Sequence, residues 1–121
     1  MKIGICAPST PFTREDGDRV TALAAASHPD VELVFDPQCY TENGHFAGTD
    51  RERLTAFVDL ANDPGIDAIW FVRGGYGACR IAESAVEGLK DVARRKLYMG
   101  YSDQGNLLGC LQRHGFPHLA H

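Results

Sequence analysis

The sequence lacks any run of about 20 apolar residues, the length that a helix needs to cross a bilayer. The apolar stretch at its start is too short for the core of a secretion signal and is broken by Pro8. Basic residues are also few, since 12 Lys and Arg stand against 16 Asp and Glu for a net charge of -4. We therefore expect a cytoplasmic protein with neither a nucleic acid nor a membrane as partner.

Cysteine is sparse and carries no metal-site spacing. The chain has four cysteines, namely Cys6, Cys39, Cys79 and Cys110. None belongs to a Cys-x-x-Cys pair, and no Cys and His spacing is typical of a zinc site. The pattern favours free thiols that serve as small buried apolar side chains, and it predicts no metal and no cofactor.

What the sequence does contain is an alternation of strand and helix patterns. Apolar strands are expected at 2–7, 31–35, 66–72 and 96–101, with another beginning in 116–120. Helices are expected at 16–27, after a Thr49–Glu52 capping box, at 79–85, within 86–95, and from 103 or 104 to 114. A long polar loop covers 36–48. This order predicts one α/β domain over 1–121, with an open, mainly parallel, Rossmann-like sheet flanked by helices.

Ligands of open parallel sheets bind beyond the carboxyl ends of the strands, and a glycine-rich loop follows the third strand there. Its sequence is Arg73-Gly74-Gly75-Tyr76-Gly77. Glycine permits positive φ and lets a ligand approach the backbone amides. The loop has neither Walker nor dinucleotide spacing, so it is either a tight turn or a binding loop of another kind.

The fourth strand leads directly into Ser102, and a helix is expected just after it. This is the geometry of a nucleophile elbow, in which a serine sits on a sharp turn beside a free amide. Gly100 supplies the small residue two positions before the serine, whereas Gln104 replaces the small residue expected two positions after it. The alternative is that Ser102 or Asp103 is only a helix N-cap.

A serine nucleophile needs a base, and the sequence offers no convincing one. The five histidines are His28, His45, His114, His118 and His121. His28 and His114 are expected at helix ends, where histidine contacts the last carbonyls. Either Ser102 is not a nucleophile, or its base lies on sequence outside this chain.

The glycine-rich loop, followed by the Gly100-Tyr101-Ser102-Asp103 turn, resembles the LD-carboxypeptidase family of serine peptidases. The segment from Ile3 to Ser9 is similar to that family's first strand and loop. The resemblance implies hydrolysis of the bond between an L-residue and a terminal D-amino acid. The usual substrate is a murein tetrapeptide or muropeptide, which loses D-alanine during peptidoglycan recycling. It also implies a cytoplasmic, commonly dimeric enzyme that needs no metal.

Carried over by motif, Ser102 is the catalytic nucleophile. The oxyanion hole is implied to consist of the backbone N–H of Asp103 and one from the Gly74-Gly75 turn, Gly75 by preference. The histidine and glutamate partners are implied to belong to a C-terminal domain that this chain lacks, so the isolated chain is expected to be inactive.

Arg73, Gly74 and Tyr76 are implied to shape the substrate site. One departure is that Gly105 stands where the family usually has threonine. Two other interpretations remain open: a non-enzymatic module that binds an anion at the glycine-rich loops, and the branch of the same family that cleaves a peptide-nucleotide antibiotic for self-immunity.

Overall fold

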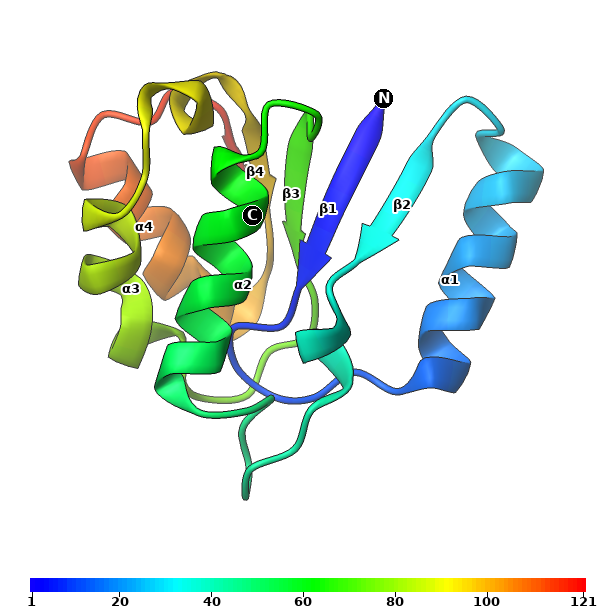
Figure 1. The fold of residues 1–121 in the computed structure, drawn as a ribbon, viewed down its shortest axis with the longest axis horizontal. Coiled ribbons are helices and arrows are strands. Elements are labelled where there is room, and N and C mark those ends of the chain that lie inside the picture. Colours follow the sequence, from blue (N-terminus) through cyan, green and yellow to red (C-terminus); the bar gives the residue numbers. More distant parts are fainter.

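A computed structural model describes all residues, 1–121. Its centre is a five-stranded parallel sheet in the order β2-β1-β3-β4-β5 (Figure 1). The strands are β1 (Lys2–Cys6), β2 (Glu32–Phe35), β3 (Ala68–Phe71), β4 (Leu97–Met99) and β5 (Leu119–Ala120). The α/β fold and the parallel sheet expected from the sequence are confirmed.

Four α-helices connect the strands. They are α1 (Arg14–Ser27), α2 (Asp50–Asn62), α3 (Ala78–Glu87) and α4 (Gly105–Arg113). The expected capping box is present at α2, because the Thr49 hydroxyl accepts from the Glu52 amide while the Glu52 carboxylate accepts from Thr49. Gly115 follows α4 with a φ of +81°, the left-handed conformation that glycine commonly adopts just after a helix.

Two expected segments differ in detail. The region 86–95, expected to be a further helix, instead contains the end of α3 and a 3-10 helix, η2 (Asp91–Arg95). The polar segment 36–48 carries another 3-10 helix, η1 (Pro37–Tyr40), and it is anchored rather than free. Cys39 is fully buried, and the Gln38 amide nitrogen donates to the carbonyls of Ala7 and Ala47.

The larger core lies between the sheet and α2, α3 and α4, which stand together in Figure 1. Phe57 of α2 packs edge-on against Phe71 and Tyr98 of the sheet, and Tyr98 packs edge-on against Phe116. Edge-to-face contacts between buried aromatic rings add to the stabilisation from burial. The apolar stripe of α4 faces this core, where Leu107, Leu108 and Leu111 are buried. This core fixes the strands whose ends carry the candidate site.

The opposite face of the sheet is covered less completely, with α1 standing apart at the edge beside β2 (Figure 1). The apolar stripe of α1 is not buried: Leu23 is 62% exposed, and only Gly17 of the helix is buried. The stripe instead lines an apolar groove of about 470 Å³ with residues of the sheet. The sheet contributes Ile3, Leu33, Trp70 and Met99 to this groove.

All four cysteines are free. Cys6, Cys39 and Cys110 are buried as expected, but Cys79 is exposed, because it lies in the first turn of α3 on the side away from the sheet core. Burial raises the pKa of Cys39 to about 12, so this thiol stays protonated at neutral pH. None of the helices combines the length and apolar character required to cross a membrane.

Candidate functional site

The candidate site lies beyond the carboxyl ends of β1, β3 and β4, which are neighbours in the sheet. The connection after β1 leads to β2 on one side of it, whereas the connection after β3 leads to β4 on the other side. Ligands of open α/β sheets bind at such a switch point. Three loops meet there: 7–10 after β1, 72–77 after β3, and 100–102 after β4. The two loops singled out in the sequence are thus brought together.

Ser102 occupies a sharp turn between β4 and the short 3-10 helix η3 (Ser102–Gln104). Its φ is +56°, a left-handed conformation that costs a non-glycine residue about 1–2 kcal/mol. Neither η3 nor α4 has a side-chain cap, so the N-cap interpretation of Ser102 and Asp103 is wrong. Ser102 is exposed and forms no hydrogen bond through its side chain. Its strained backbone therefore serves the exposure of the hydroxyl rather than the helix start.

The glycine-rich loop lies directly against Ser102. A Cβ placed on Gly74 would lie 3.0 Å from both Cβ and Oγ of Ser102 and 3.7 Å from the amide nitrogen of Asp103. Gly75 has a φ of +102° and approaches Thr10 so closely that any side chain there would clash. The backbone N–H groups of Gly74, Gly75 and Asp103 donate to no acceptor in the chain. Amides without partners therefore gather beside the exposed hydroxyl.

The Asp103 carboxylate ties the three loops together. Its Oδ2 accepts from the Ser9 hydroxyl and, at 3.0 Å, from the amide of Ala78 at the start of α3. Thr10 adds a bond of 2.7 Å from its hydroxyl to the carbonyl of Gly74. These bonds cross-link segments that are far apart in sequence, and they hold the Ser102 turn in register with the glycine-rich loop.

Gln104 explains why the elbow departs from the pattern of small residues. Its side chain is fully buried, and its amide nitrogen donates to Ser9 Oγ at 3.1 Å and to the carbonyl of Arg73 at 3.0 Å. Space is made by Gly100, where a Cβ would lie 2.8 Å from that of Gln104. The larger residue is thus accommodated beneath the turn and acts as another link between the loops.

Arg53 of α2 is fully buried and contacts the backbone of the loops that form the site. Its guanidinium donates to the carbonyls of Pro8 at 2.7 Å and Gly77 at 2.9 Å, and to Gly48 at 3.3 Å. Asp50, one turn earlier on the helix, is its ionic partner. One buried cation therefore satisfies backbone carbonyls from three separate segments.

Arg73 and Tyr76, expected to shape the substrate site, project outward. Both are exposed, and Arg73 also has a positive φ of +62°. The Tyr76 ring lies 6.0 Å from the ring of Phe46. The Arg53 guanidinium in turn stacks on the Phe46 ring, 4.7 Å from its centroid. The segment 36–48 thus contributes an aromatic contact to the edge of the site.

Asp50 also accepts three hydrogen bonds from the exposed Arg80, two at 2.9 Å and one at 3.2 Å. These bonds lower the pKa of Asp50 below its ordinary value. A lowered folded-state pKa gives stability above the unfolded-state pKa of about 4, and that stability is lost as pH falls through the folded-state value. We expect Asp50→Asn to destabilise the protein at neutral pH and to have little effect in strong acid.

Urea denaturation of both proteins at neutral and acidic pH measures this effect. Asp59→Asn, on the exposed face of the same helix, is the matched control and should change the midpoint little at either pH. An equal loss for Asp50→Asn at both pH values would contradict the role given to its charge.

No histidine hydrogen-bonds to Ser102. His45 is exposed in the 36–48 segment. His114 lies at the end of α4, as expected, and its Nδ1 is 2.9 Å from the carbonyl oxygen of Cys110. His121 lies beside the start of α4, with Nε2 3.4 Å from the position of a Cβ on Gly105. None of the four surface cavities includes Ser102. The serine is presented on an open surface without a base bonded to it.

The family model for the LD-carboxypeptidase N-terminal domain matches residues 3–121 of the sequence. This chain belongs to the LD-carboxypeptidase family. The resemblance drawn from the two loops is thereby confirmed. The matched region includes every loop of the candidate site.

Among relatives of the family, a murein tetrapeptide carboxypeptidase from Pseudomonas aeruginosa is 34% identical over 73 residues, which are 60% of this chain and 24% of that protein. The muramoyltetrapeptide carboxypeptidase structure from Oxalobacter formigenes has a TM-score of 0.71 at 25% identity, and it covers 95% of this chain and 38% of its own. The structure of the microcin C7 self-immunity protein, in complex with aspartyl sulfamoyl adenosine, has a TM-score of 0.76 at 25% identity. The match covers 94% of this chain and 34% of the microcin protein's chain. The chain thus spans well under half the length of these family members.

Several residues of the site have no strong signal in the sequence. Ser9 and Thr10 lie in the first loop, yet only the pairing of β1 with β3 shows that they reach Asp103 and Gly74. Arg53 reads as an ordinary helix-surface cation. Its one signal is that it lies one turn after Asp50 and one turn before the buried Phe57 on the same helix.

Proposed function

We propose that this LD-carboxypeptidase domain carries the serine nucleophile of an enzyme that removes the terminal D-alanine from murein tetrapeptides. The observation that carries the proposal is the strained, exposed Ser102 facing Gly74 across a set of unpaired amides. The relatives named as murein or muramoyltetrapeptide carboxypeptidases supply the substrate class. The physiological setting would be peptidoglycan recycling in the cytoplasm.

In the proposed mechanism, Ser102 Oγ attacks the carbonyl carbon of the L,D-peptide bond. The negative charge that develops on the carbonyl oxygen is stabilised by the N–H groups of Asp103 and Gly75, which have no other acceptor. Because Asp103 and Gly74 are bonded to the first loop, these donors are fixed before the substrate arrives, and no reorganisation is needed at the transition state.

The proton of Ser102 needs an acceptor, and no side chain of residues 1–121 is bonded to that hydroxyl. We infer that the base is a histidine oriented by a glutamate, provided by the rest of a longer protein, in agreement with the small share of each relative that this chain covers. The open surface around Ser102 would then receive the remaining wall of the substrate site, with Arg73 and Tyr76 at its edge. Assembly as a homodimer is part of the same proposal.

The test is an assay of D-alanine release from a murein tetrapeptide, performed on this chain and on a longer protein that contains it. Activity is expected only in the longer protein. Activity of the isolated 121-residue chain would contradict the external base. Failure of a serine-directed fluorophosphonate to label the longer protein, together with tight phosphate binding, would instead favour an anion-binding module at the same loops.

The microcin neighbour supports a second candidate substrate, a peptide-nucleotide antibiotic. Its fold matches over nearly the whole chain, so the fold of this domain is compatible with either branch. Parallel assays with a murein tetrapeptide and an aminoacyl sulfamoyl adenosine distinguish the branches. The substrate with the higher kcat/KM identifies the physiological class.

A further inference from the structure

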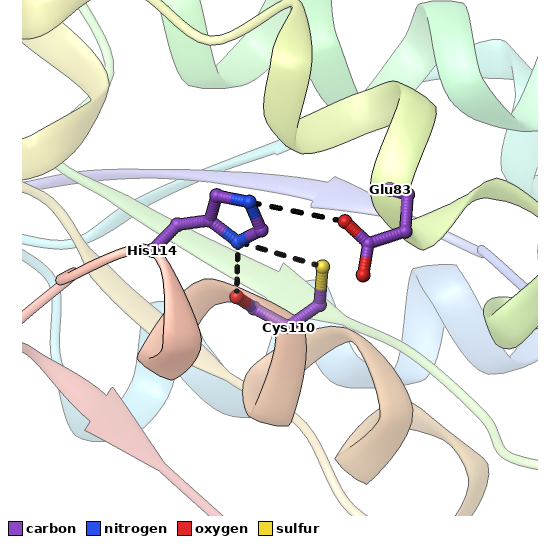
Figure 2. Close-up of side chains that lie close together, drawn as sticks. All are labelled: Glu83, Cys110 and His114. Atoms are coloured by element: carbon purple, nitrogen blue, oxygen red, sulfur yellow. Dashed lines mark hydrogen bonds and ion pairs between the residues drawn. The ribbon is translucent and has the colours of Figure 1, made fainter.

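Away from the Ser102 site, three side chains of different chemistry meet between α3 and α4 (Figure 2). Glu83 comes from α3 and Cys110 from α4, while His114 follows Cys110 by one turn as the C-cap residue of α4. Their nearest ligand atoms all lie within 4.8 Å of one another. Cys110 is about two helical turns beyond Ser102 along the chain, so this cluster is not part of the candidate hydrolase site.

The histidine has its metal-binding nitrogen already oriented. Its Nδ1 lies 2.9 Å from the carbonyl oxygen of Cys110, which can only accept, so Nδ1 carries the proton and the neutral ring keeps a lone pair on Nε2. Metal-ligating histidines commonly have the other ring nitrogen bonded to a backbone carbonyl in this way.

The carboxylate is held in a complementary manner. Arg113 pairs with Oε1 of Glu83, which leaves Oε2 directed at His114 Nε2 at a distance of 3.8 Å. Two lone-pair atoms therefore face each other across a gap, with the Cys110 sulfur 3.9 Å from the other nitrogen of the ring. Tetrahedral zinc with ordinary bond lengths separates its ligand atoms by about 3.3–3.8 Å, so the Glu83 and His114 atoms are already spaced for zinc. The Cys110 sulfur, which lies on the Nδ1 side of the ring, would move toward Nε2 as the ion binds.

We propose that Glu83, Cys110 and His114 form a binding site for a Zn²⁺ ion, with water as the fourth ligand. Sulfur, imidazole nitrogen and carboxylate oxygen are the donors that zinc takes in proteins, whereas magnesium and calcium select oxygen alone. The ion would join the middle of α3 to the C-terminal end of α4. The N-terminal ends of the same helices lie close in sequence to Gly77 and Ser102, so the metal would brace the two helices that follow the site loops.

Binding requires the Cys110 thiol to give up its proton to solvent as the sulfur–zinc bond forms. Burial, followed by the hydrogen bond with Glu83, raises the pKa of that thiol above its ordinary value. Each zinc bound should therefore release about one proton near neutral pH. The charged or titratable neighbour that faces the sulfur from α3 is Glu83. Those at the end of its own helix are Arg113 and His114.

Titration of the 121-residue chain with Co²⁺, a spectroscopic substitute for zinc, tests the proposal. We expect one equivalent to produce a thiolate-to-cobalt charge-transfer band and tetrahedral d–d bands, both lost when Zn²⁺ is added. Cys110→Ser should remove the charge-transfer band. Glu83→Gln and His114→Gln, both at exposed positions that leave the fold intact, should each weaken cobalt binding at least about tenfold.

Matched controls separate this site from the other thiol and histidines. Cys79→Ser removes the exposed cysteine of α3, and His28→Gln removes the histidine at the end of α1; both should leave the spectrum and affinity unchanged. Absence of a cobalt spectrum in the unmodified chain would overturn the site, as would loss of the band in Cys79→Ser. If Cys110→Ser does not fold, unchanged affinity of Glu83→Gln and His114→Gln would overturn it equally.

Discussion

Replacing Ser102 with alanine in a longer protein that contains this domain should reduce D-alanine release by at least about a thousandfold. Removing the nucleophile of a serine hydrolase leaves only the catalysis supplied by the oxyanion donors and by substrate binding. KM should change little, because the Ser102 hydroxyl makes no contact that holds the ground state or the fold. The measurement is steady-state kinetics with a murein tetrapeptide.

Two companion substitutions separate chemistry from folding. Ser84→Ala, an exposed serine on α3, should retain full activity. Ser102→Gly should be as inactive as Ser102→Ala yet no less stable than the parent protein, because glycine adopts a φ of +56° without strain. Retention of activity in Ser102→Ala would refute the nucleophile, whereas inactivity caused by unfolding would be recognised by circular dichroism.

The largest effect on stability is expected for Arg53→Met in the 121-residue chain. Methionine fills a similar volume but leaves the carbonyls of Pro8, Gly48 and Gly77 buried without their donor. Unpaired buried acceptors of this kind should lower the free energy of unfolding by about 3–5 kcal/mol in total. Urea denaturation with a common m-value measures the loss.

Arg51→Met is the matched control, since Arg51 is exposed on the same helix and should change stability by no more than about 0.5 kcal/mol. The stability loss for Arg53→Lys should lie between the losses for Arg53→Met and Arg51→Met. An ammonium group keeps the charge but cannot reach three carbonyls as the forked guanidinium does. A loss below about 1 kcal/mol for Arg53→Met would show that the carbonyls find other donors.

The strand pattern and the two site loops could be predicted from the sequence because both depend on local chemistry. Apolar runs bounded by proline and glycine fix the strands, and only glycine suits the φ of +102° at position 75 and the close approach at position 74. The family resemblance rested on the same loops. Their meeting at one edge follows from the parallel order, which the alternation of elements implies.

The cross-links of the site could not be predicted in this way. The bond from Ser9 to Asp103 spans 94 residues, and it depends on β1 and β4 both flanking β3, an order that no local pattern specifies. The incomplete packing of α1 against the sheet could not be predicted either. The helix has an apolar stripe of Val20, Leu23 and Ala24, but periodicity identifies an apolar face without telling whether anything packs on it.

The apolar groove under α1 has a practical consequence for solution studies of this domain. Trp70 is the only tryptophan in the chain, and it lines that groove. The intrinsic fluorescence of the protein is therefore a single-site signal from this face of the sheet. Any polypeptide that covers the groove should shift the emission to shorter wavelength and reduce quenching by iodide, with no label attached.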